Sequence, residues 1–354
     1  MRRFQLPELS RAVLVVASCS AISQASAQAT RKLEMLSPAK GQVVVGNEPA
    51  ALELSTGKVV ATMMGARGVV LIDFETGRAD TIGRSGGGPG EFGVPRAIMP
   101  WSRGRYAVMD IALSRLTLMK EPATFDTVIS VPNGHEASSS AAQSDGIWYS
   151  VGARDAHDSL ALVRSSKFGN RRDTVARLAR PKPTMTPIGR GTAMNLTPEY
   201  APTDAWGLLS DGRVWIARGS DNRVDWVSPE GRLTLGSPRL FSRIRTVDAD
   251  RHKFHGMPAP IAIDTLKRAI APLKAPFQGV VAADNGELWI WKNQPAGYKK
   301  ERYLRIGASG NIISELELPL AHKIVAVSKS FLYILSMNDD EEYLLARHPK
   351  PTVP

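Results

Sequence analysis

Short runs of β-branched and aromatic residues, each bounded by turn residues, dominate the chain from residue 28 onward. Clear examples are residues 58–62, 68–72, 213–217 and 287–291. Runs of this length and composition are typical of β-strands. Helical spacing of apolar residues occurs in one insertion only, so the pattern predicts an all-β fold.

A tight turn recurs just before strands that carry a tryptophan. The three clearest copies are Asp145-Gly146 before Trp148, Asp211-Gly212 before Trp215 and Asn285-Gly286 before Trp289. Asp-Gly and Asn-Gly favour the positive φ angles of tight hairpins. A second glycine turn follows each copy, for example Gly231, 19 residues after Gly212, which leaves room for two strands between the turns. Each unit is therefore a four-stranded antiparallel meander, the form of a propeller blade, and we expect the tryptophans to pack between neighbouring blades.

Five complete units and one incomplete unit follow one another along the chain. The complete units span about residues 50–82, 96–130, 136–178, 204–240 and 277–318. The last unit begins at His322, has three strands and ends at Pro349 without a fourth. Because a closed ring leaves no free strand edge, we expect an N-terminal strand near Arg31 to Leu36 to complete it. The sequence predicts a six-bladed β-propeller of four-stranded antiparallel blades, closed by an N-terminal strand.

Two segments lie outside the repeat. Residues 181–200 are rich in Pro, Thr and Gly and predict a long loop between blades three and four. Residues 246–276 contain Ile261, Leu266 and Ile270 at helical spacing, which predicts a short, partly helical insertion between blades four and five. Long insertions between regular elements serve either function or surface elaboration, and the sequence leaves both open.

The strands of blades two and four carry a resemblance to a known family. Residues 105–110, followed by Ser114-Arg115-Leu116, resemble an NHL repeat, as do residues 214–217 with Asn222-Arg223-Val224. The glycine-rich run 86–92 resembles the lead-in of bacterial six-bladed NHL-like propellers. The resemblance covers nearly all of the chain after the leader. It implies the propeller fold and does not imply one activity.

The first 27 residues have the pattern of a signal peptide. Arg2, Arg3 and Arg11 are basic, residues 12–22 are mostly apolar, and Ala25-Ser26-Ala27 fits a signal-peptidase site. We therefore expect cleavage after Ala27 and export of the remaining chain to the periplasm or the extracellular space.

Cys19, the only cysteine of the chain, gives a second interpretation of the leader. Residues 16–19 resemble a bacterial lipobox, in which Cys19 would be lipidated and would attach the protein to a membrane. Under either interpretation the propeller domain, residues 28–354, contains no disulfide. We expect no membrane partner unless Cys19 is lipidated.

The formal net charge is +11 and the sequence pI is about 9.8. The basic residues are scattered along the chain, and Glu301 interrupts the densest cluster, residues 299–302. Scattered charge is typical of solvated loops. Together with the export signal, it argues against nucleic acid as a partner.

Two motifs of catalytic or phosphate-binding sites are missing from the sequence. The chain has no His-Glu-x-x-His, and the glycine run 86–90 lacks the Lys-Ser/Thr ending of a phosphate loop. Trp101 is the best candidate for an exposed aromatic. His135 and His322 precede the inner strands of opposite blades, which suits either solvated loops or a metal pair. The sequence predicts no metal site and no cofactor.

Inner strands converge on the propeller axis, so residues at their first positions ring one mouth of the channel. The candidate ligand-binding residues are Glu48, Arg96, His135, Glu136, Tyr200, Asp204, Gln278, His322 and Lys323. Polar groups over an apolar wall are typical of ligand sites, although a wet channel mouth is polar in any case. We expect four of them to share one cavity: Arg96, Asp204, His322 and Lys323.

Two functions fit these observations. The first is an exported NHL-like propeller that binds a protein, peptide or glycan ligand on one face of the ring. The alternative is a metal-dependent hydrolase or lyase resembling the lactonases and amidating lyases with six-bladed propellers. The resemblance to those enzymes implies Asn, Asp, Glu or His on the inner strands, whereas segments 206–209 and 280–283 are mainly apolar. This difference favours a binding module, and whether any catalysis occurs stays open.

Overall fold

The computed structural model describes most of the chain after residue 38, and these residues belong to one compact unit. The described ranges are 39–46, 49–63, 67–102, 104–132, 140–154, 159–166, 172–189, 192–239, 241–253 and 270–352. The predicted signal peptide, residues 1–27, lies outside them. So does the segment Arg31 to Leu36. Among the described residues, no helix is long and apolar enough to cross a membrane.

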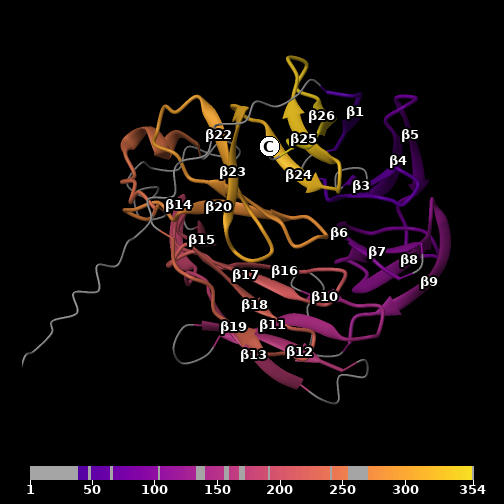
Figure 1. The fold of residues 1–354 in the computed structure, drawn as a ribbon, viewed down its shortest axis with the longest axis horizontal. Coiled ribbons are helices and arrows are strands. Elements are labelled where there is room, and N and C mark those ends of the chain that lie inside the picture. The colour runs from indigo at the N-terminus through magenta and orange to yellow at the C-terminus, as the bar shows by residue number, and fades with distance from the viewer. Residues whose placement is uncertain are drawn as a thin grey trace, which may run out of the picture. The chain divides into compact units, whose positions relative to one another are not determined.

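Six four-stranded antiparallel sheets form the ring (Figure 1). Blade one contains β2 (Ala51–Glu53), β3 (Val59–Met63), β4 (Gly68–Asp73) and β5 (Arg78–Gly83). Blade two contains β6 (Pro95–Pro100), β7 (Arg105–Asp110), β8 (Arg115–Lys120) and β9 (Thr124–Ser130). Blade three contains β10 (Ser140–Ala142), β11 (Trp148–Arg154), β12 (Ser159–Ser165) and β13 (Arg172–Ala179).

The second half of the ring repeats this arrangement. Blade four contains β16 (Ala205–Leu208), β17 (Val214–Arg218), β18 (Arg223–Val227) and β19 (Leu233–Thr234). Blade five contains β20 (Phe277–Ala282), β21 (Leu288–Lys292), β22 (Lys300–Ile306) and β23 (Ile312–Pro319). Blade six contains β24 (Lys323–Val327), β25 (Phe331–Met337), β26 (Tyr343–Pro349) and β1 (Gln42–Val45). The predicted six-bladed all-β propeller is confirmed.

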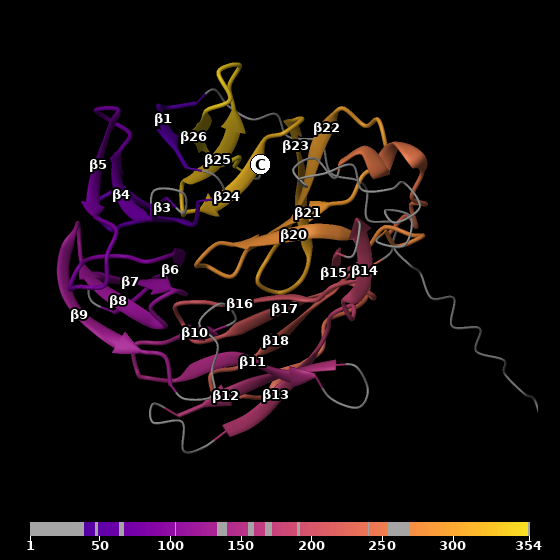
Figure 2. The same ribbon diagram turned by 180° about the vertical axis from the view of Figure 1, so that it is seen from behind.

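The first strand of each blade lies on the inside of the ring, and inner strands of neighbouring blades contact one another (Figure 2). The predicted turns that lead into the second strands have the expected backbone. Gly146, Gly212 and Gly286 have φ angles of 86°, 86° and 84°, which glycine adopts without the steric penalty of a Cβ atom. These turns set the register of the first hairpin in blades three, four and five.

The hydrophobic core lies between neighbouring blades. Trp148 packs with Met109 and Leu116 of blade two, whereas Trp289 packs with Leu332 and Ile334 of blade six. Both tryptophans are almost completely buried. The prediction that the repeated tryptophans pack between blades is confirmed, because each lies on a second strand and packs against a neighbouring sheet.

Ring closure uses a strand further along the chain than residues 31–36. The strand β1 pairs with β26, from Gln42 opposite Ala346 to Val45 opposite Tyr343. Val45 is buried in the core shared by blades six and one. Three consecutive valines favour a strand, whereas Leu, Glu and Met, which make up residues 33–36, favour a helix. An N-terminal strand therefore closes the ring as predicted, but the assignment to Arg31–Leu36 was wrong.

Removing β1 should destabilise the protein. We expect a chain that begins at Gly46 to melt at a clearly lower temperature than a chain that begins at Ala39, because β26 loses its partner and Val45 leaves the core. Differential scanning calorimetry of the two chains measures the effect. Equal melting temperatures would contradict closure by β1.

The two segments outside the repeat also differ from the prediction. Residues 181–200, expected as a long loop, contain a hairpin of β14 (Thr184–Gly189) and β15 (Thr192–Leu196). Threonine favours strands, and three threonines lie in this hairpin: Thr184, Thr186 and Thr192. The many turn residues of the segment concealed this pattern. In residues 246–276 the structure describes a short 3₁₀ helix, Asp248–Lys253. The predicted helical positions Ile261 and Leu266 lie outside the described residues.

Candidate functional site

The two segments outside the repeat meet at the beginning of blades four and five. The backbone N–H of Ala271 donates to the carbonyl of Glu199 at 2.9 Å, and that of Ala275 donates to Tyr200 at 2.8 Å. The segment 246–276 also contacts the chain before it, because the backbone N–H of Lys274 donates to the carbonyl of Ile244 at 2.8 Å. Residues 270–275 thus lie between two other backbone segments.

A cavity of about 390 Å³ opens where these segments reach the inner strands β16 and β20. Its lining residues are Pro198, Glu199, Tyr200, Ala201, Thr203, Ala205, Phe277, Gln278 and Asn293. This volume lies in the range of small-ligand pockets. Two of the predicted mouth residues, Tyr200 and Gln278, therefore line one cavity.

Tyr200 is the most constrained residue of this cavity. Its φ angle of 61° is uncommon for a residue other than glycine. Its hydroxyl is buried and has no hydrogen-bond partner among the described residues. Burial raises the pKa of Tyr200, and the carboxylates of Glu199 and Asp250 raise it further. The hydroxyl therefore stays protonated at neutral pH and can both donate and accept a hydrogen bond.

A buried ion pair lies beside Tyr200. The Nζ atom of Lys274 is 2.5 Å from Oδ1 of Asp250 and donates to the carbonyl of Gln294 at 2.8 Å. The same ammonium lies 4.8 Å from the centroid of the Tyr200 ring. Because Asp250 neutralises Lys274, the pair anchors the second segment without adding net charge to the cavity wall. Asp250 is thus engaged in this pair and in a bond from the N–H of Val247.

Asn293 contributes a buried acceptor to the cavity lining. Its Nδ2 atom donates to the carbonyls of Ala275 at 2.8 Å and Phe277 at 3.2 Å, which fixes the orientation of the amide. Its Oδ1 atom is buried and has no partner among the described residues. A buried, unpaired acceptor is costly for the unliganded protein, so this atom is suited to a ligand that donates a hydrogen bond.

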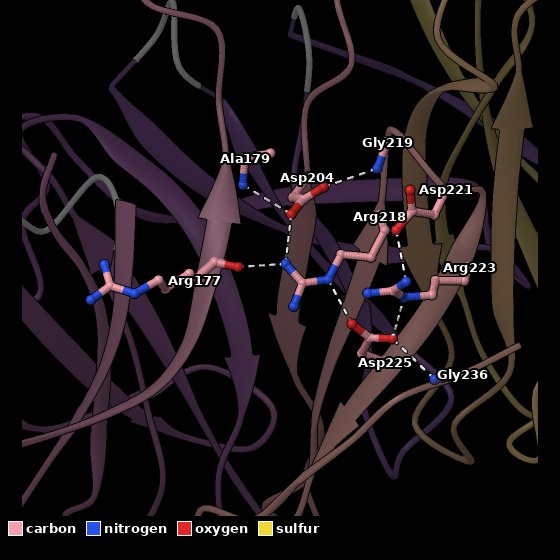
Figure 3. A network of polar contacts seen from close by, with 9 residues as sticks. All are labelled: Arg177, Ala179, Asp204, Arg218, Gly219, Asp221, Arg223, Asp225 and Gly236. Carbon is pink, nitrogen blue, oxygen red and sulfur yellow. Dashed lines mark hydrogen bonds and ion pairs between the residues drawn. The ribbon is translucent and has the colours of Figure 1, made fainter. Parts of the chain in front are cut away.

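Asp204, another predicted mouth residue, lies instead in the junction between blades three and four (Figure 3). Oδ2 accepts from the N–H of Ala179 at 2.9 Å and from Nη1 of Arg218 at 2.7 Å, and Oδ1 accepts from the N–H of Gly219 at 2.9 Å. The side chain is 2% exposed. Asp204 does not line the cavity with Tyr200 and Gln278, because the adjacent backbone and Arg218 draw its carboxylate into the wall.

The remaining predicted residues lie elsewhere around the ring. Arg96 is exposed on β6. The ring of His322 contacts the carbonyl of Leu320 through Nδ1 at 3.2 Å, and Nζ of Lys323 lies 5.6 Å from the centroid of the Trp291 ring. None of these three lines the 390 Å³ cavity. Three further predicted residues lie outside the described part of the chain: Glu48, His135 and Glu136.

A second cavity, of about 290 Å³, lies at the opposite ends of the inner strands of blades two to four. Trp101 lines it together with Ser102, Ser144 and Ser210. Trp101 is half-buried and packs against the core of blades two and three. The expected exposed aromatic therefore belongs mainly to the wall of the ring. In the part of the chain that the structure describes, no three His, Cys, Asp or Glu side chains form a group that could hold a metal ion.

The sequence alone identified only part of this cavity. Gln278 was found because it lies near the start of the inner strand β20, and Tyr200 because it lies shortly before the inner strand β16. Lys274 and Asn293 were missed, because they lie in a segment outside the repeat and after a second strand. The pairing of a lysine with an aspartate 24 residues earlier gives no periodic signal.

Comparisons with known proteins give the fold. No family model matches the chain, and no curated protein sequence matches it. Many solved structures do match it. A protein from Bacteroides fragilis named as exported shares 11% identity over 90% of this chain and 94% of that chain, with a TM-score of 0.51. A member of the DUF4221 family from Bacteroides vulgatus shares 9% identity over 89% and 98%, with a TM-score of 0.50.

The chain is a six-bladed β-propeller. A gluconolactonase from Xanthomonas campestris is also similar, with 11% identity over 89% of this chain and 88% of that chain and a TM-score of 0.44. Likeness at these identities shows the shared architecture alone, since one fold supports many unrelated activities. The function of this propeller has to be argued from its own residues.

Proposed function

We propose that this protein is an exported binding module that holds a short glycan or peptide segment in the 390 Å³ cavity at the beginning of blades four and five. One observation carries the proposal. The two segments outside the repeat are joined by backbone hydrogen bonds beside this cavity, and the lining includes two buried hydrogen-bonding atoms, the Tyr200 hydroxyl and Asn293 Oδ1, that have no partner among the described residues.

The chemistry of the wall favours a polar ligand without a negative charge. Phe277 and Tyr200 supply aromatic surface, while Gln278 and Asn293 supply amide groups. Glu199 is the acidic residue of the lining. Aromatic surface combined with a few convergent polar groups is the usual composition of a small-ligand site. Hydroxyl groups of a sugar, or the N–H groups of a peptide, match these acceptors and donors.

Export is part of the proposal. The basic start, apolar stretch and Ala25-Ser26-Ala27 site support secretion of the chain, with lipidation at Cys19 as the alternative. A structural relative named as exported is consistent with this location. A binding module in the periplasm or outside the cell meets glycans and peptides of the cell envelope and its surroundings.

Substitutions in the cavity should weaken binding without unfolding the protein. We expect Tyr200→Phe and Gln278→Ala each to lower the affinity for an oligosaccharide or peptide selected from an array by about 5- to 20-fold, which corresponds to one lost hydrogen bond. Isothermal titration calorimetry measures the affinity, and Ser144→Ala, at the opposite mouth, is the matched control. Melting temperatures should stay nearly constant, because Gln278 is exposed and the Tyr200 hydroxyl has no described partner.

Two results would contradict the proposal. One is an affinity that responds to Ser144→Ala as strongly as to the cavity variants. The other is stoichiometric Ca²⁺ or Zn²⁺ in the purified protein together with hydrolysis or elimination of a lactone or peptide substrate. The second result would establish the metal-dependent enzyme as the correct alternative.

A further inference from the structure

A separate cavity of about 420 Å³ lies against blade five, on the far side of Asn293. One wall consists of side chains from β21, β22 and β23, including Lys292, Arg302 and Glu315. The opposite wall consists of the chain that follows β19, including Arg239, Phe241 and Ser242. Asn293 lines both cavities, whereas Tyr200 lines only the 390 Å³ cavity and Arg239 only this one.

Arg239 places a buried guanidinium in this cavity without a counter-ion among the described residues. Its Nε and Nη2 atoms are buried and lack any hydrogen-bond partner in the described part of the chain. Nη1 makes one long contact, 3.4 Å to the carbonyl of Gly310. Burial lowers the pKa of Arg239, which shows that the charge is poorly solvated, although arginine remains protonated at neutral pH.

Nε and Nη2 of Arg239, which have no partner among the described residues, form the edge of a guanidinium that binds a carboxylate side-on. Elsewhere in blade five, Arg305 uses the same two atoms: Nε contacts Oε2 of Glu287 at 3.2 Å, and Nη2 contacts Oε1 at 2.9 Å. In a guanidinium, the N–H of Nε and one N–H of Nη2 point in parallel and match the two oxygens of a carboxylate. Arg239 therefore offers the arrangement that Arg305 fills with Glu287.

The other charges of the cavity wall are already compensated. Lys292 pairs with Glu315 at 3.1 Å, and Arg302 pairs with Glu317 at 2.7 Å. The hydrogen bonds from Lys300, Tyr298 and Arg302 lower the pKa of Glu317 to about 2, so this carboxylate stays charged. Glu317 is shared by Arg302 and Lys300. Among the described residues, Arg239 is the basic side chain of the cavity lining that has no ion pair, and one carboxylate would satisfy it.

We propose that this cavity binds a small monocarboxylate that also carries hydroxyl groups, such as a sugar acid. The carboxylate forms a bidentate pair with Nε and Nη2 of Arg239. The hydroxyl groups lie against the polar and aromatic side chains of the wall, where Ser242 and Gln294 supply polar groups and Phe241 and Tyr298 supply rings. A volume of 420 Å³ accommodates one sugar ring with its carboxylate.

Calorimetric titration of the full-length mature chain with D-glucuronate, and with D-glucose as the neutral probe of the same size, tests the proposal. We expect D-glucuronate to bind and D-glucose to bind at least tenfold more weakly, since one charge-assisted bidentate pair is lost. Arg239→Gln and Arg239→Lys should each weaken glucuronate binding about tenfold or more, because lysine keeps the charge but lacks the parallel donors. Arg78→Gln, which removes an exposed arginine on β5, is the control for net charge and should not weaken it.

A second measurement does not depend on the choice of probe. Without ligand, Arg239→Met should raise the melting temperature, because it removes a buried charge that has no counter-ion among the described residues. A lowered melting temperature would show that another part of the chain supplies the counter-ion, and would overturn the proposal. Equal binding of glucuronate and glucose, or no loss in Arg239→Gln, would also overturn it. None of these results changes the expectation for Tyr200 and Gln278.

Discussion

Replacing Arg218 by methionine is expected to lower the free energy of unfolding by about 3–5 kcal/mol, the cost of leaving buried charges unpaired. Arg218 joins two acidic residues: Nη1 lies 2.7 Å from Oδ2 of Asp204, and Nε lies 2.6 Å from Oδ2 of Asp225. Both carboxylates are at most 2% exposed. Nη1 also donates to the carbonyl of Arg177 in β13, so the side chain ties blade three to blade four (Figure 3).

The loss of stability comes from the buried carboxylates that are left without Arg218, rather than from the lost packing contacts of the arginine. Burial lowers the pKa of Arg218, but the hydrogen bonds and charges of Asp225 and Asp204 raise it more, and the net shift is upward. The guanidinium is therefore charged at neutral pH. Methionine fills a similar volume and supplies no donor. Both acidic side chains stay buried, but Asp204 loses its ion pair and Asp225 keeps only the one with Arg223.

A double substitution separates this explanation from a simple packing defect. Oδ2 of Asp225 accepts from Arg218, whereas Oδ1 accepts from Arg223 at 3.0 Å and from the N–H of Gly236 at 3.0 Å. Asp225→Asn can keep the Oδ1 contacts and remove the charge. Added to Arg218→Met, it should therefore recover part of the lost stability in urea denaturation.

The control for this series is Arg84→Met, which removes an arginine that is 85% exposed and pairs with Glu91. Exposed ion pairs contribute about 0–1 kcal/mol, so this variant should denature close to the unsubstituted protein. An Arg218→Met variant that loses no more stability than Arg84→Met would contradict the explanation, as would a double variant that is less stable than Arg218→Met alone.

Replacing Asp110 by alanine is expected to cost about 3 kcal/mol, because several backbone N–H groups lose their acceptor together. The carboxylate is fully buried at the end of β7. Oδ1 accepts from the N–H groups of Val94, Ala112 and Leu113 at 3.0, 3.1 and 3.0 Å, and Oδ2 accepts from that of Gly93 at 2.6 Å. One side chain thus holds the segment before blade two against the turn after β7.

Asp110→Asn should have a smaller effect than Asp110→Ala. Three of the four bonds converge on Oδ1, which asparagine retains, while its amide nitrogen would face the N–H of Gly93 as a second donor. We expect a loss of about 1–2 kcal/mol for Asn, one unsatisfied group. Urea denaturation of both variants gives the order, and an asparagine variant as unstable as the alanine variant would show that the charge, not the number of acceptors, dominates.

Asp110 and Arg218 occupy the same place in the repeat, and the comparison shows the limit of the sequence pattern. Each ends a second strand and precedes, by four residues, a residue with positive φ: Ser114 at 48° and Asn222 at 49°. In blade two this position is Asp110, which supplies the carboxylate. In blade four the position is Arg218, and the carboxylate comes from Asp204, which directly precedes β16 and accepts from the N–H of Gly219. The sequence shows an acidic residue near a channel mouth, whereas only the structure shows that this residue is bonded into the wall.

The number of blades and their turns could be predicted from the sequence because they depend on local rules. Asp-Gly and Asn-Gly turns, four strands per unit and a repeated tryptophan recur at short separations, and every blade buries the same faces. The existence of a closing N-terminal strand followed from the missing fourth strand of blade six. Its position did not, because pairing of β1 with β26 joins residues about 300 positions apart, and only side-chain packing selects residues 42–45.

The candidate site depended on the tertiary structure for the same reason. Tyr200 and Gln278 were predictable because they lie before or at the start of inner strands, but the cavity that they share is built by contacts between segments that have no repeat. Glu199 meets Ala271, and Lys274 meets Asp250, only after the ring has closed and brought blades four and five together. The sequence also cannot show that two atoms of Arg239 are buried without a partner among the described residues, because burial depends on the folded chain. Local sequence therefore determined the propeller, and packing across the ring decided where its binding chemistry lies.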